Sequence, residues 1–453
     1  MQNIYLTCWG GVGIVTGANF LLEHADKKIL IDCGLIQGEK FATDDNRKPF
    51  PYNPSEIDYL FVTHAHLDHV GRIPKLVKDG FKGVIYSTPE TKSLGVLILE
   101  DACRILEKDA THDGVLPMYE MNDVNKAISL WKEIPYHQEF TVYEGLSVYL
   151  RDAGHVLGSS MFEFHIGGKK IMFTGDLGNS PTLLLKDTEE IKGIDYLVME
   201  SVYGDRNHEP KDERRKKLMD VINETAKRGG AVVIPAFSLE RTQIILYELN
   251  HLVENKLIQS VPIFIDSPLA IKVTAIYKQS KNYFNDKVQE EIRGGDDIFN
   301  FPRLKYSMSG QDSMAIRNTP NPKIIIAGSG MSAGGRVTHH EINYLPDARS
   351  TILLVGYQTL GTLGRRLQDG EKKVLINGQE VEVKAHIETI NGYSSHKDSD
   401  HLVEFVDSTR DAVKEIFVVM GEPKASLFLV QKLRDNLGVN AIYPERGKKY
   451  ELG

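Results

Sequence analysis

The chain has 453 residues, of which 41% are hydrophobic and 26% are charged, so it can form one very large folded domain or two ordinary ones. Its 54 basic and 62 acidic residues give a net charge of −8, which argues against broad, non-specific binding of duplex nucleic acid but leaves room for a local basic groove. No apolar run approaches the ~18 residues that span a membrane, and the N-terminus lacks a signal-peptide pattern and begins with an expected strand over residues 1–6. The widely spaced Cys8, Cys33 and Cys103 form neither a disulfide framework nor a zinc motif. We therefore expect a soluble, cytoplasmic protein without a membrane partner.

The first two hundred residues alternate short strands with turns and two helices. A hairpin turn is expected at Ala25-Asp26-Lys27. The segment 69–79 has the apolar spacing of a helix, but Pro74 lies inside it, so the helix should begin late or kink. The expected strands are 19–23, 28–32, 59–63, 146–152, 170–174 and 196–200, and the expected helices are 69–79 and 92–108.

From about Tyr203 strands and helices alternate regularly, which predicts a parallel sheet with right-handed crossovers. The expected helices here are 211–228, 240–257 and 336–343, and the expected strands are 231–236, 262–266, 323–327 and 351–356. The last stretch resembles the first two hundred residues in its pattern, with strands expected at 380–390 and 415–420 and helices at 401–408 and 424–436. One αβ domain interrupted by a second α/β domain is therefore expected.

A run of histidines and an aspartate, His64-Ala65-His66-Leu67-Asp68-His69, follows the expected strand 59–63. Alternate positions of an extended segment point to the same side, so His64 and His66 can face one ion. The turn into the helix then brings Asp68 and His69 beside them. Nitrogen and oxygen donors of this kind suit zinc, although manganese and iron stay open.

Further polar residues stand at the ends of expected strands, next to glycine: Asp32, His155 and Asp176. Sites in αβ proteins collect at the carboxyl ends of strands. These residues are therefore further candidates for the same site.

The order of these motifs resembles that of the metallo-β-lactamase superfamily. Downstream segments resemble the β-CASP insert of ribonucleases related to the cleavage and polyadenylation specificity factor nuclease: 200–206 (ESVYGDR), 235–243 (PAFSLERTQ), 327–331 (AGSGM), 361–364 (GTLG) and 393–396 (YSSH). The resemblance implies an α/β fold, namely a metallo-β-lactamase αββα sandwich with an inserted parallel α/β β-CASP domain. The expected limits are 1–206 and 369–453 for the sandwich and 207–368 for the insert.

The resemblance also implies a site with two zinc ions per chain. One ion would be held by His64, His66 and His155, the other by Asp68, His69 and His396, with Asp176 bridging the two and Asp32 orienting a ligand histidine. Two such ions can share a hydroxide, lower its pKa and stabilise the charge on a phosphodiester. Asp32, Asp68, Glu200 and His396 are the expected catalytic residues.

Two positions depart from the family pattern. Glu200 matches the acidic residue that pairs with a histidine in relatives, but Arg366 stands where that histidine is expected. Arginine cannot donate a proton at neutral pH; it can hold a phosphate oxygen or pair with Glu200. Met420 replaces the histidine that usually precedes Gly421-Glu422.

The expected substrate-binding residues lie mainly in the insert. The glycine-rich segment 327–336 lies between a strand and a helix, where backbone N–H groups can cradle a phosphate. The candidates are Arg241, Ser267, Ser329, Gly330, Met331, Arg336, Arg366 and Ser395.

The favoured function is a zinc-dependent ribonuclease acting on single-stranded RNA in RNA processing or decay, endonucleolytic with 5′-exonucleolytic cleavage as a second mode. His396 favours RNA, because DNA-processing members of the family usually carry valine there. A DNA nuclease or a small-molecule esterase on the same fold is the alternative, and a non-catalytic RNA-binding protein is the third hypothesis, disfavoured because all seven candidate ligands are present. Relatives commonly form homodimers, so a homodimer remains open.

Overall fold

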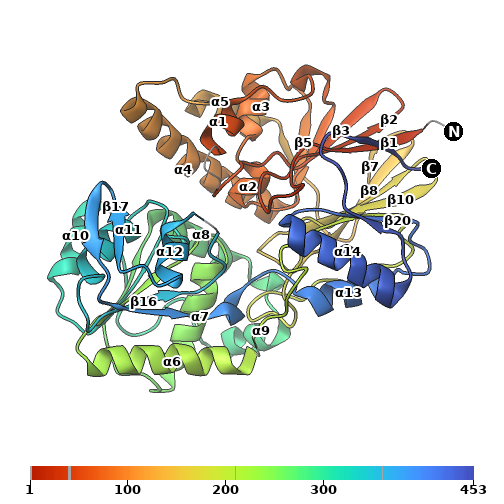
Figure 1. The fold of residues 1–453 in the computed structure, drawn as a ribbon. Helices are drawn as coiled ribbons and strands as arrows, with labels where there is room; N and C mark the ends of the chain where they lie inside the picture. The colour runs from red at the N-terminus through yellow and green to blue at the C-terminus, as the bar shows by residue number, and fades with distance from the viewer. Residues whose placement is uncertain (1–2, 39–41, 210, 360) are drawn as a thin grey trace. The chain divides into compact units, whose positions relative to one another are not determined.

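The structure is a computed structural model that describes residues 3–38, 42–209, 211–359 and 361–453. Met1 and Gln2, where the first strand was expected to begin, lie outside these residues. Contacts divide the described residues into two compact units (Figure 1). Unit one comprises residues 3–37, 42–207 and 396–453, and unit two comprises Gly38 and residues 208–209, 211–359 and 361–395.

Unit one contains two seven-stranded sheets. Sheet one has the order β22 (Lys449–Glu451), β1 (Ile4–Cys8), β2 (Phe20–His24), β3 (Lys27–Ile31), β4 (Tyr59–Phe61), β5 (Val84–Ser87) and β6 (Trp131–Glu133). Sheet two has the order β21 (Ala441–Ile442), β20 (Glu415–Val418), β11 (Tyr196–Met199), β10 (Lys169–Phe173), β9 (Ser160–Ile166), β8 (Leu146–Asp152) and β7 (Glu139–Tyr143). In both sheets antiparallel hairpins lead into parallel strands, so several carboxyl ends meet at one edge.

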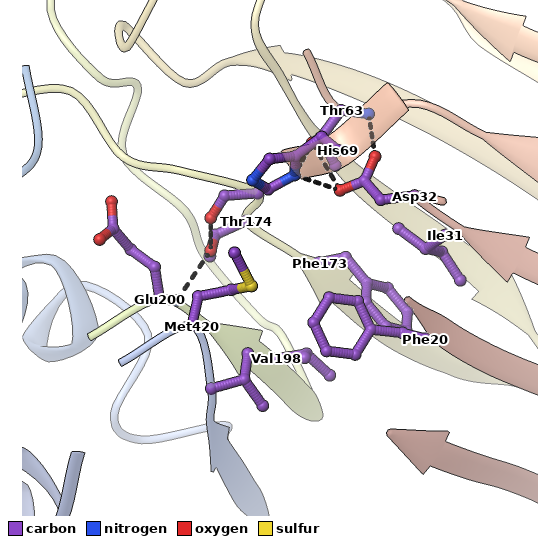
Figure 2. Close-up of a pocket in the computed structure, with 12 residues that line it drawn as sticks. Phe20, Ile31, Asp32, Thr63, His69, Phe173, Thr174, Val198, Glu200 and Met420 are labelled. Atoms are coloured by element: carbon purple, nitrogen blue, oxygen red, sulfur yellow. Dashed lines mark hydrogen bonds and ion pairs between the residues drawn. The ribbon is translucent and has the colours of Figure 1, made fainter. Parts of the chain in front are cut away.

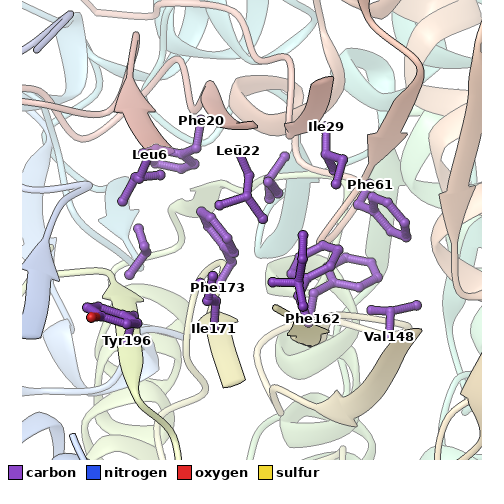
Figure 3. Packing of buried hydrophobic residues seen from close by; sticks show 14 of the residues in the cluster. Leu6, Phe20, Leu22, Ile29, Phe61, Val148, Phe162, Ile171, Phe173 and Tyr196 are labelled. Carbon is purple, nitrogen blue, oxygen red and sulfur yellow. The ribbon is translucent and has the colours of Figure 1, made fainter. Parts of the chain in front are cut away.

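The main core of unit one lies between the inner faces of these sheets. Strand β8 shows the alternation behind it, because every second side chain from Leu146 to Asp152 is buried. Figure 3 shows apolar side chains of sheet one, such as Phe20 and Phe61, facing those of sheet two, such as Phe162 and Phe173. The ring of Phe61 meets the ring of Phe162 edge-on, with 5.3 Å between centroids.

Helices cover the outer face of each sheet in unit one (Figure 1). Sheet one is covered by α2 (Leu67–Val70), α3 (Ile73–Lys78), α4 (Pro89–Asp113) and α5 (Met121–Ser129), with α1 (Ala42–Arg47) and the short 3₁₀ helix Pro54–Glu56 nearby in sequence. Sheet two is covered by α13 (Ser399–Asp407) and α14 (Pro423–Leu437). The ends of α14 carry residues that are common at helix ends: the helix begins at a proline and is followed by Gly438 in the left-handed conformation. The layers form the expected αββα sandwich.

Unit two contains a six-stranded, fully parallel sheet, as expected. Its order is β14 (Leu304–Tyr306), β13 (Ile263–Asp266), β15 (Lys323–Ala327), β12 (Ala231–Pro235), β16 (Thr351–Leu354) and β19 (His386–Thr389). Its helices are α6 (Lys211–Lys227), α7 (Arg241–Glu254), α8 (Pro268–Gln279), α9 (Asp286–Arg293), α10 (Gly310–Asn318), α11 (Val337–Tyr344) and α12 (Leu363–Gln368), with 3₁₀ turns at Lys281–Tyr283 and Asn391–Tyr393. A separate hairpin joins β17 (Lys373–Ile376) to β18 (Gln379–Glu382).

Two further sequence predictions are tested by these elements. The expected break near Pro74 is confirmed, because α2 and α3 are separate and Pro74 occupies the first turn of α3. The single strand expected over 380–390 is wrong: β18 belongs to the hairpin and β19 to the parallel sheet. The chain turns between them where Lys384 and Ala385 donate their N–H groups to the carbonyl of Leu345, which no local pattern announces. The expected domain limits remain a prediction.

Replacing Phe162 by alanine should lower the free energy of unfolding of unit one by about 3–5 kcal/mol, because a buried ring is lost from a packed core. Chemical denaturation followed by tryptophan fluorescence measures the change. Leu116→Ala is the control, because that side chain is 83% exposed and its loss should change stability by less than about 0.5 kcal/mol. Equal losses in the two variants would contradict the assignment of the core.

Candidate metal centre

Seven polar side chains from distant parts of unit one meet at the carboxyl-terminal ends of its parallel strands. Most of them lie in the loops that follow β4, β8 and β10, Asp68 and His69 lie in α2, and His396 precedes α13 and forms an isolated β-bridge with Gly178. The seven are His64, His66, Asp68, His69, His155, Asp176 and His396. The structure thus brings together all seven residues that the sequence proposes as ligands.

The first donor group comprises His64, His66, His155 and Asp176, whose nearest donor atoms all lie within 4.8 Å of one another. His66 Nδ1 is 3.1 Å from His64 Nε2 and 3.3 Å from His155 Nε2. Asp176 Oδ2 is 3.5 Å from His64 Nε2 and 3.6 Å from His155 Nε2. Donors around a tetrahedral ion with bonds of ~2.1 Å are about 3.4 Å apart, so this group has the dimensions of a metal site.

The second donor group surrounds the other oxygen of Asp176. His69 Nε2 lies 3.5 Å from Asp176 Oδ1 and 3.9 Å from Asp68 Oδ2. Both His69 Nε2 and Asp176 Oδ1 are buried, and neither has a hydrogen-bond partner among the residues that the structure describes. Buried polar atoms normally have partners, so two such atoms facing each other fit a cation between them.

A different second group, Asp176, Glu200 and His396, also meets the distance requirement for a metal. The oxygens of Glu200 already have partners, because Oε1 accepts from the N–H of Leu177 at 2.6 Å and Oε2 accepts from the N–H of Val202 at 3.3 Å. The orphaned Nε2 of His69 instead favours the group that contains Asp68 and His69. We therefore assign Glu200 no ligand role.

Asp32 lies behind the ligands, fully buried at the end of β3. Its Oδ2 accepts hydrogen bonds at 2.8 Å from His69 Nδ1 and from the hydroxyl of Thr63, and its Oδ1 accepts from the N–H of Thr63. Figure 2 shows these three residues together above a small cavity. The bond from Nδ1 fixes the ring of His69 and directs its Nε2 toward Asp176.

The charges of the site are strongly coupled. Burial raises the pKa of Asp176, but the rings of His69, His64 and His396 outweigh burial and hold that pKa well below its usual range. Burial likewise lowers the pKa of His69, but Asp176 and Asp32 raise it well above its ordinary value. In contrast, the pKa of His64 falls well below its ordinary value because of burial and the neighbouring His69. A buried carboxylate among imidazoles attracts positive charge, which a metal cation supplies.

His396 is tied to Glu200. His396 Nδ1 lies 3.2 Å from Glu200 Oε1 and 3.9 Å from Asp176 Oδ2, and its ring lies against that of His155, with 4.6 Å between centroids. Burial lowers the pKa of His396, but Glu200, Asp176 and Asp68 raise it to about 9. Glu200 therefore contacts a candidate ligand directly.

The structure shows what surrounds Arg366 and Met420, the two residues that depart from the family pattern. Arg366 forms hydrogen bonds of 2.6–3.0 Å to Glu371 within unit two. Met420 lines the cavity of Figure 2 together with Phe20 and Val198. The position at which the family resemblance led us to expect a histidine is thus occupied by an apolar side chain that lines this cavity.

The glycine-rich segment of unit two is held in place by its own neighbours. The carbonyl of Gly330 accepts from the side chain of Gln358 at 3.2 Å, and the carbonyl of Met331 accepts from the N–H of Gly364 at 3.1 Å. The hydroxyl of Ser329 accepts from the N–H of Ala333 at 3.0 Å. These contacts fix the loop at the carboxyl ends of the parallel strands.

The other substrate-binding candidates in unit two also have partners. Ser267 caps α8 and lies 3.3 Å from the hydroxyl of Ser238. Arg241 donates to the hydroxyl of Ser395 at 3.4 Å. The guanidinium of Arg336 donates to buried Asp266 at 2.7 Å and to the carbonyls of Ser307 and Met308 at 3.0 Å. The substrate roles of all eight candidates remain predictions; Arg336 and Arg366 already have strong acceptors.

The sequence reasoning missed two groups. Thr63, directly before His64, contacts Asp32 and both neighbouring histidines. His340 donates to Asp266 at 2.7 Å and helps to lower the pKa of that carboxyl to about 2 despite burial. A hydroxyl residue at the end of the expected strand, directly before the histidine run, was a usable signal for Thr63, whereas the pair of Asp266 and His340 is separated by 74 positions and had none.

Three family models match the chain. A model of the metallo-β-lactamase superfamily matches residues 13–236, a model of the Beta-Casp domain matches residues 242–367, and a model described as "Zn-dependent metallo-hydrolase RNA specificity domain" matches residues 380–444. The αββα sandwich and its buried donors define the class of metal-dependent hydrolases.

Relatives narrow this class. The chain is 34% identical to "Ribonuclease TTHA0252" of Thermus thermophilus, over 93% of this chain and 94% of that protein. It is 31% identical to "Transcription termination factor FttA" of Methanosarcina mazei and to the protein of the same name in Pyrococcus abyssi, each over 97% of this chain and 70% of the relative. The chain belongs to the β-CASP family of the metallo-β-lactamase superfamily.

A solved structure supports the fold alone. A protein of unknown function from Enterococcus faecalis V583 matches with a TM-score of 0.56 at 13% identity, covering 99% of this chain and 100% of that one. Separately, no helix in the described ranges has both the length and the apolar character to cross a membrane.

Glu341, buried on α11 beneath the glycine-rich loop, should make unit two sensitive to pH. Burial raises the pKa of Glu341 to about 8, while the hydroxyl of Ser332 partly opposes that rise. Because the folded-state pKa lies above the unfolded one, the stabilisation is complete at low pH and is lost as pH rises through about 8. The free energy of unfolding of the wild type should therefore fall relative to that of Glu341→Gln between about pH 5 and pH 8 and level off above that. Parallel pH profiles of the two proteins would contradict this.

Proposed function

We propose that the chain is a zinc-dependent ribonuclease that hydrolyses phosphodiester bonds of single-stranded RNA with two metal ions. The observation that carries the proposal is the pair of donor groups that share Asp176. The name of the Thermus relative and the description of the model that matches residues 380–444 support RNA as the substrate. Endonucleolytic cleavage is the expected mode, and 5′-exonucleolytic cleavage is the second mode to be tested.

The residues would divide between two ions. His64, His66 and His155 would hold one, Asp68, His69 and His396 would hold the other, and Asp176 would contribute one oxygen to each. Bound divalent ions would stabilise, as Lewis acids, the negative charge that develops on the phosphodiester. They would also lower the pKa of the attacking water, so that it loses a proton more easily and becomes a better nucleophile.

The remaining side chains would orient these donors. Asp32 directs the Nε2 of His69 toward Asp176 through the bond to its Nδ1. Glu200 holds the Nδ1 of His396, and it is itself fixed by the N–H of Leu177. Arg366, paired with Glu371, stays charged at neutral pH and supplies no proton to the leaving oxygen. Its proposed role is to contact phosphate.

A cleavage assay tests the function. Purified protein loaded with zinc should cleave single-stranded RNA labelled at its 5′ end or internally, and should lose this activity in a chelator and regain it when zinc is added back. Asp176→Asn should lower the rate by about a thousandfold or more, because several kcal/mol of charge stabilisation depend on the metals that Asp176 joins. Full activity in the chelator, or faster cleavage of DNA or of an ester substrate, would contradict the proposal.

Glu200→Gln should lower metal affinity at the ion held by His396, and RNA cleavage with it, by about 10- to 100-fold, because the carboxylate orients that ring. Metal titration and single-turnover kinetics measure the two effects. Glu190→Gln is the matched control, since Glu190 lies on the surface of the same unit with its side chain 78% exposed. An unchanged metal affinity in Glu200→Gln would show that Glu200 does not position His396.

Two further predictions concern the whole molecule. We propose a cytoplasmic location, and the family resemblance of the sequence leaves a homodimer to be tested. Light scattering coupled to size-exclusion chromatography distinguishes a dimer from the 50.9 kDa monomer.

A further inference from the structure

Thr63 is held firmly between strand β4 and the first ligand histidine. Its side chain is buried, with 1% of the residue exposed. Its N–H donates to Asp32 Oδ1 at 2.8 Å, and its carbonyl accepts from the N–H of Ser160 at 2.9 Å. The backbone therefore leaves the hydroxyl little freedom of position.

Three polar atoms surround that hydroxyl. Thr63 Oγ1 lies 2.8 Å from Asp32 Oδ2, 3.1 Å from His64 Nδ1 and 3.4 Å from His69 Nδ1. An ionised carboxylate only accepts hydrogen bonds, whereas a hydroxyl donates one and accepts others. The hydroxyl proton therefore goes to Asp32, and a lone pair of Oγ1 remains to accept from the Nδ1–H of His64.

This hydrogen-bond assignment fixes the tautomer of two rings. His69 donates its Nδ1–H to Asp32 directly, and His64 donates its Nδ1–H to Thr63. In the neutral form that binds a metal, each ring then has its lone pair on Nε2. The two Nε2 atoms face the two oxygens of Asp176, with His64 at 3.5 Å from Oδ2 and His69 at 3.5 Å from Oδ1.

We propose that Thr63 is a positioning residue. Its hydroxyl donates to Asp32 and accepts from His64, and this relay lets the carboxylate of Asp32 orient the ring of His64. One buried carboxylate thereby orients a ligand of each metal ion: His69 by direct contact and His64 through the hydroxyl. The inference rests on the two-ion site of the proposed function and is independent of the substrate.

Gly175 supplies a separate observation. It directly precedes Asp176, and a Cβ atom on it would lie 2.6 Å from the Cβ of Thr63 and 2.8 Å from Oγ1. Gly175 also has a φ of +55°, which side chains rarely adopt. The segment that carries the bridging carboxylate thus needs glycine in order to leave room for the Thr63 side chain.

Two substitutions separate the hydroxyl from its methyl group. Thr63→Val keeps the shape of the side chain and removes the hydroxyl, and Thr63→Ser keeps the hydroxyl. Zinc affinity is measured by competition with a chromophoric chelator, and bound zinc per chain by elemental analysis. Circular dichroism and thermal unfolding establish that each variant is folded.

Thr63→Val should weaken one of the two binding steps about 10- to 100-fold and leave the other within about threefold. Thr63→Ser should bind both ions within about threefold of the wild type. Asp32→Asn should weaken both steps, because it stands at the origin of both hydrogen-bond paths. His155→Ala should weaken the same step as Thr63→Val, since His155 belongs to the group that contains His64.

Thr174→Val is the matched control. Thr174 is also buried at the end of a strand and lines the same cavity, but its hydroxyl contacts the carbonyl of Gly175 and the N–H of Glu200 rather than a ring nitrogen (Figure 2). It should change neither binding step by more than about threefold.

Several results would overturn the relay. The relay would be refuted if Thr63→Val bound zinc with wild-type affinity, or if Thr63→Ser or Thr174→Val lost as much zinc affinity as Thr63→Val. It would also be refuted if Asp32→Asn weakened only one of the two binding steps. Fewer than two zinc ions in the wild type would instead refute the two-ion site itself, and this measurement precedes any comparison of variants.

Discussion

The rest of this site depends on the contacts between the buried carboxylate of Asp176 and the histidines around it. Its two oxygens face different donor groups, His64 with His155 on one side and His69 on the other. A buried carboxylate and buried imidazoles with unsatisfied atoms are costly unless positive charge compensates them. The family to which the chain belongs supplies that charge with metal ions, so the cluster is best understood as a site built for cations.

The αββα sandwich places these donors by simple geometry. Parallel strands in both sheets end at one edge, and the ligand residues follow their last residues. The packed aromatic core between the sheets, which includes the contact between Phe61 and Phe162, holds the two sheets together. Behind the donors, Asp32 and Glu200 hold ring nitrogens at fixed positions. Rigid strands and buried hydrogen bonds thus give precision to a site assembled from residues up to 332 positions apart.

Much of this arrangement was predictable from sequence, because metal donors at strand ends leave local patterns. The run from His64 to His69 is enough to predict a metal site. The break near Pro74 is expected because the proline ring does not fit inside a helix. Other features depend on tertiary contacts that sequence periodicity does not record. The strand expected over 380–390 splits because the carbonyl of Leu345 captures two amides, and the partner of Arg366 is Glu371, five residues away, rather than a residue of the site.

The central claim is that Asp176 joins two metal positions with different histidine ligands. Anomalous diffraction from crystals of the zinc-loaded protein, recorded on both sides of the zinc edge, tests it most directly. Two peaks are predicted, one among His64, His66 and His155 and one among Asp68, His69 and His396, both in contact with Asp176. A single peak, or a second peak held by Glu200 without Asp68 and His69, would contradict the account.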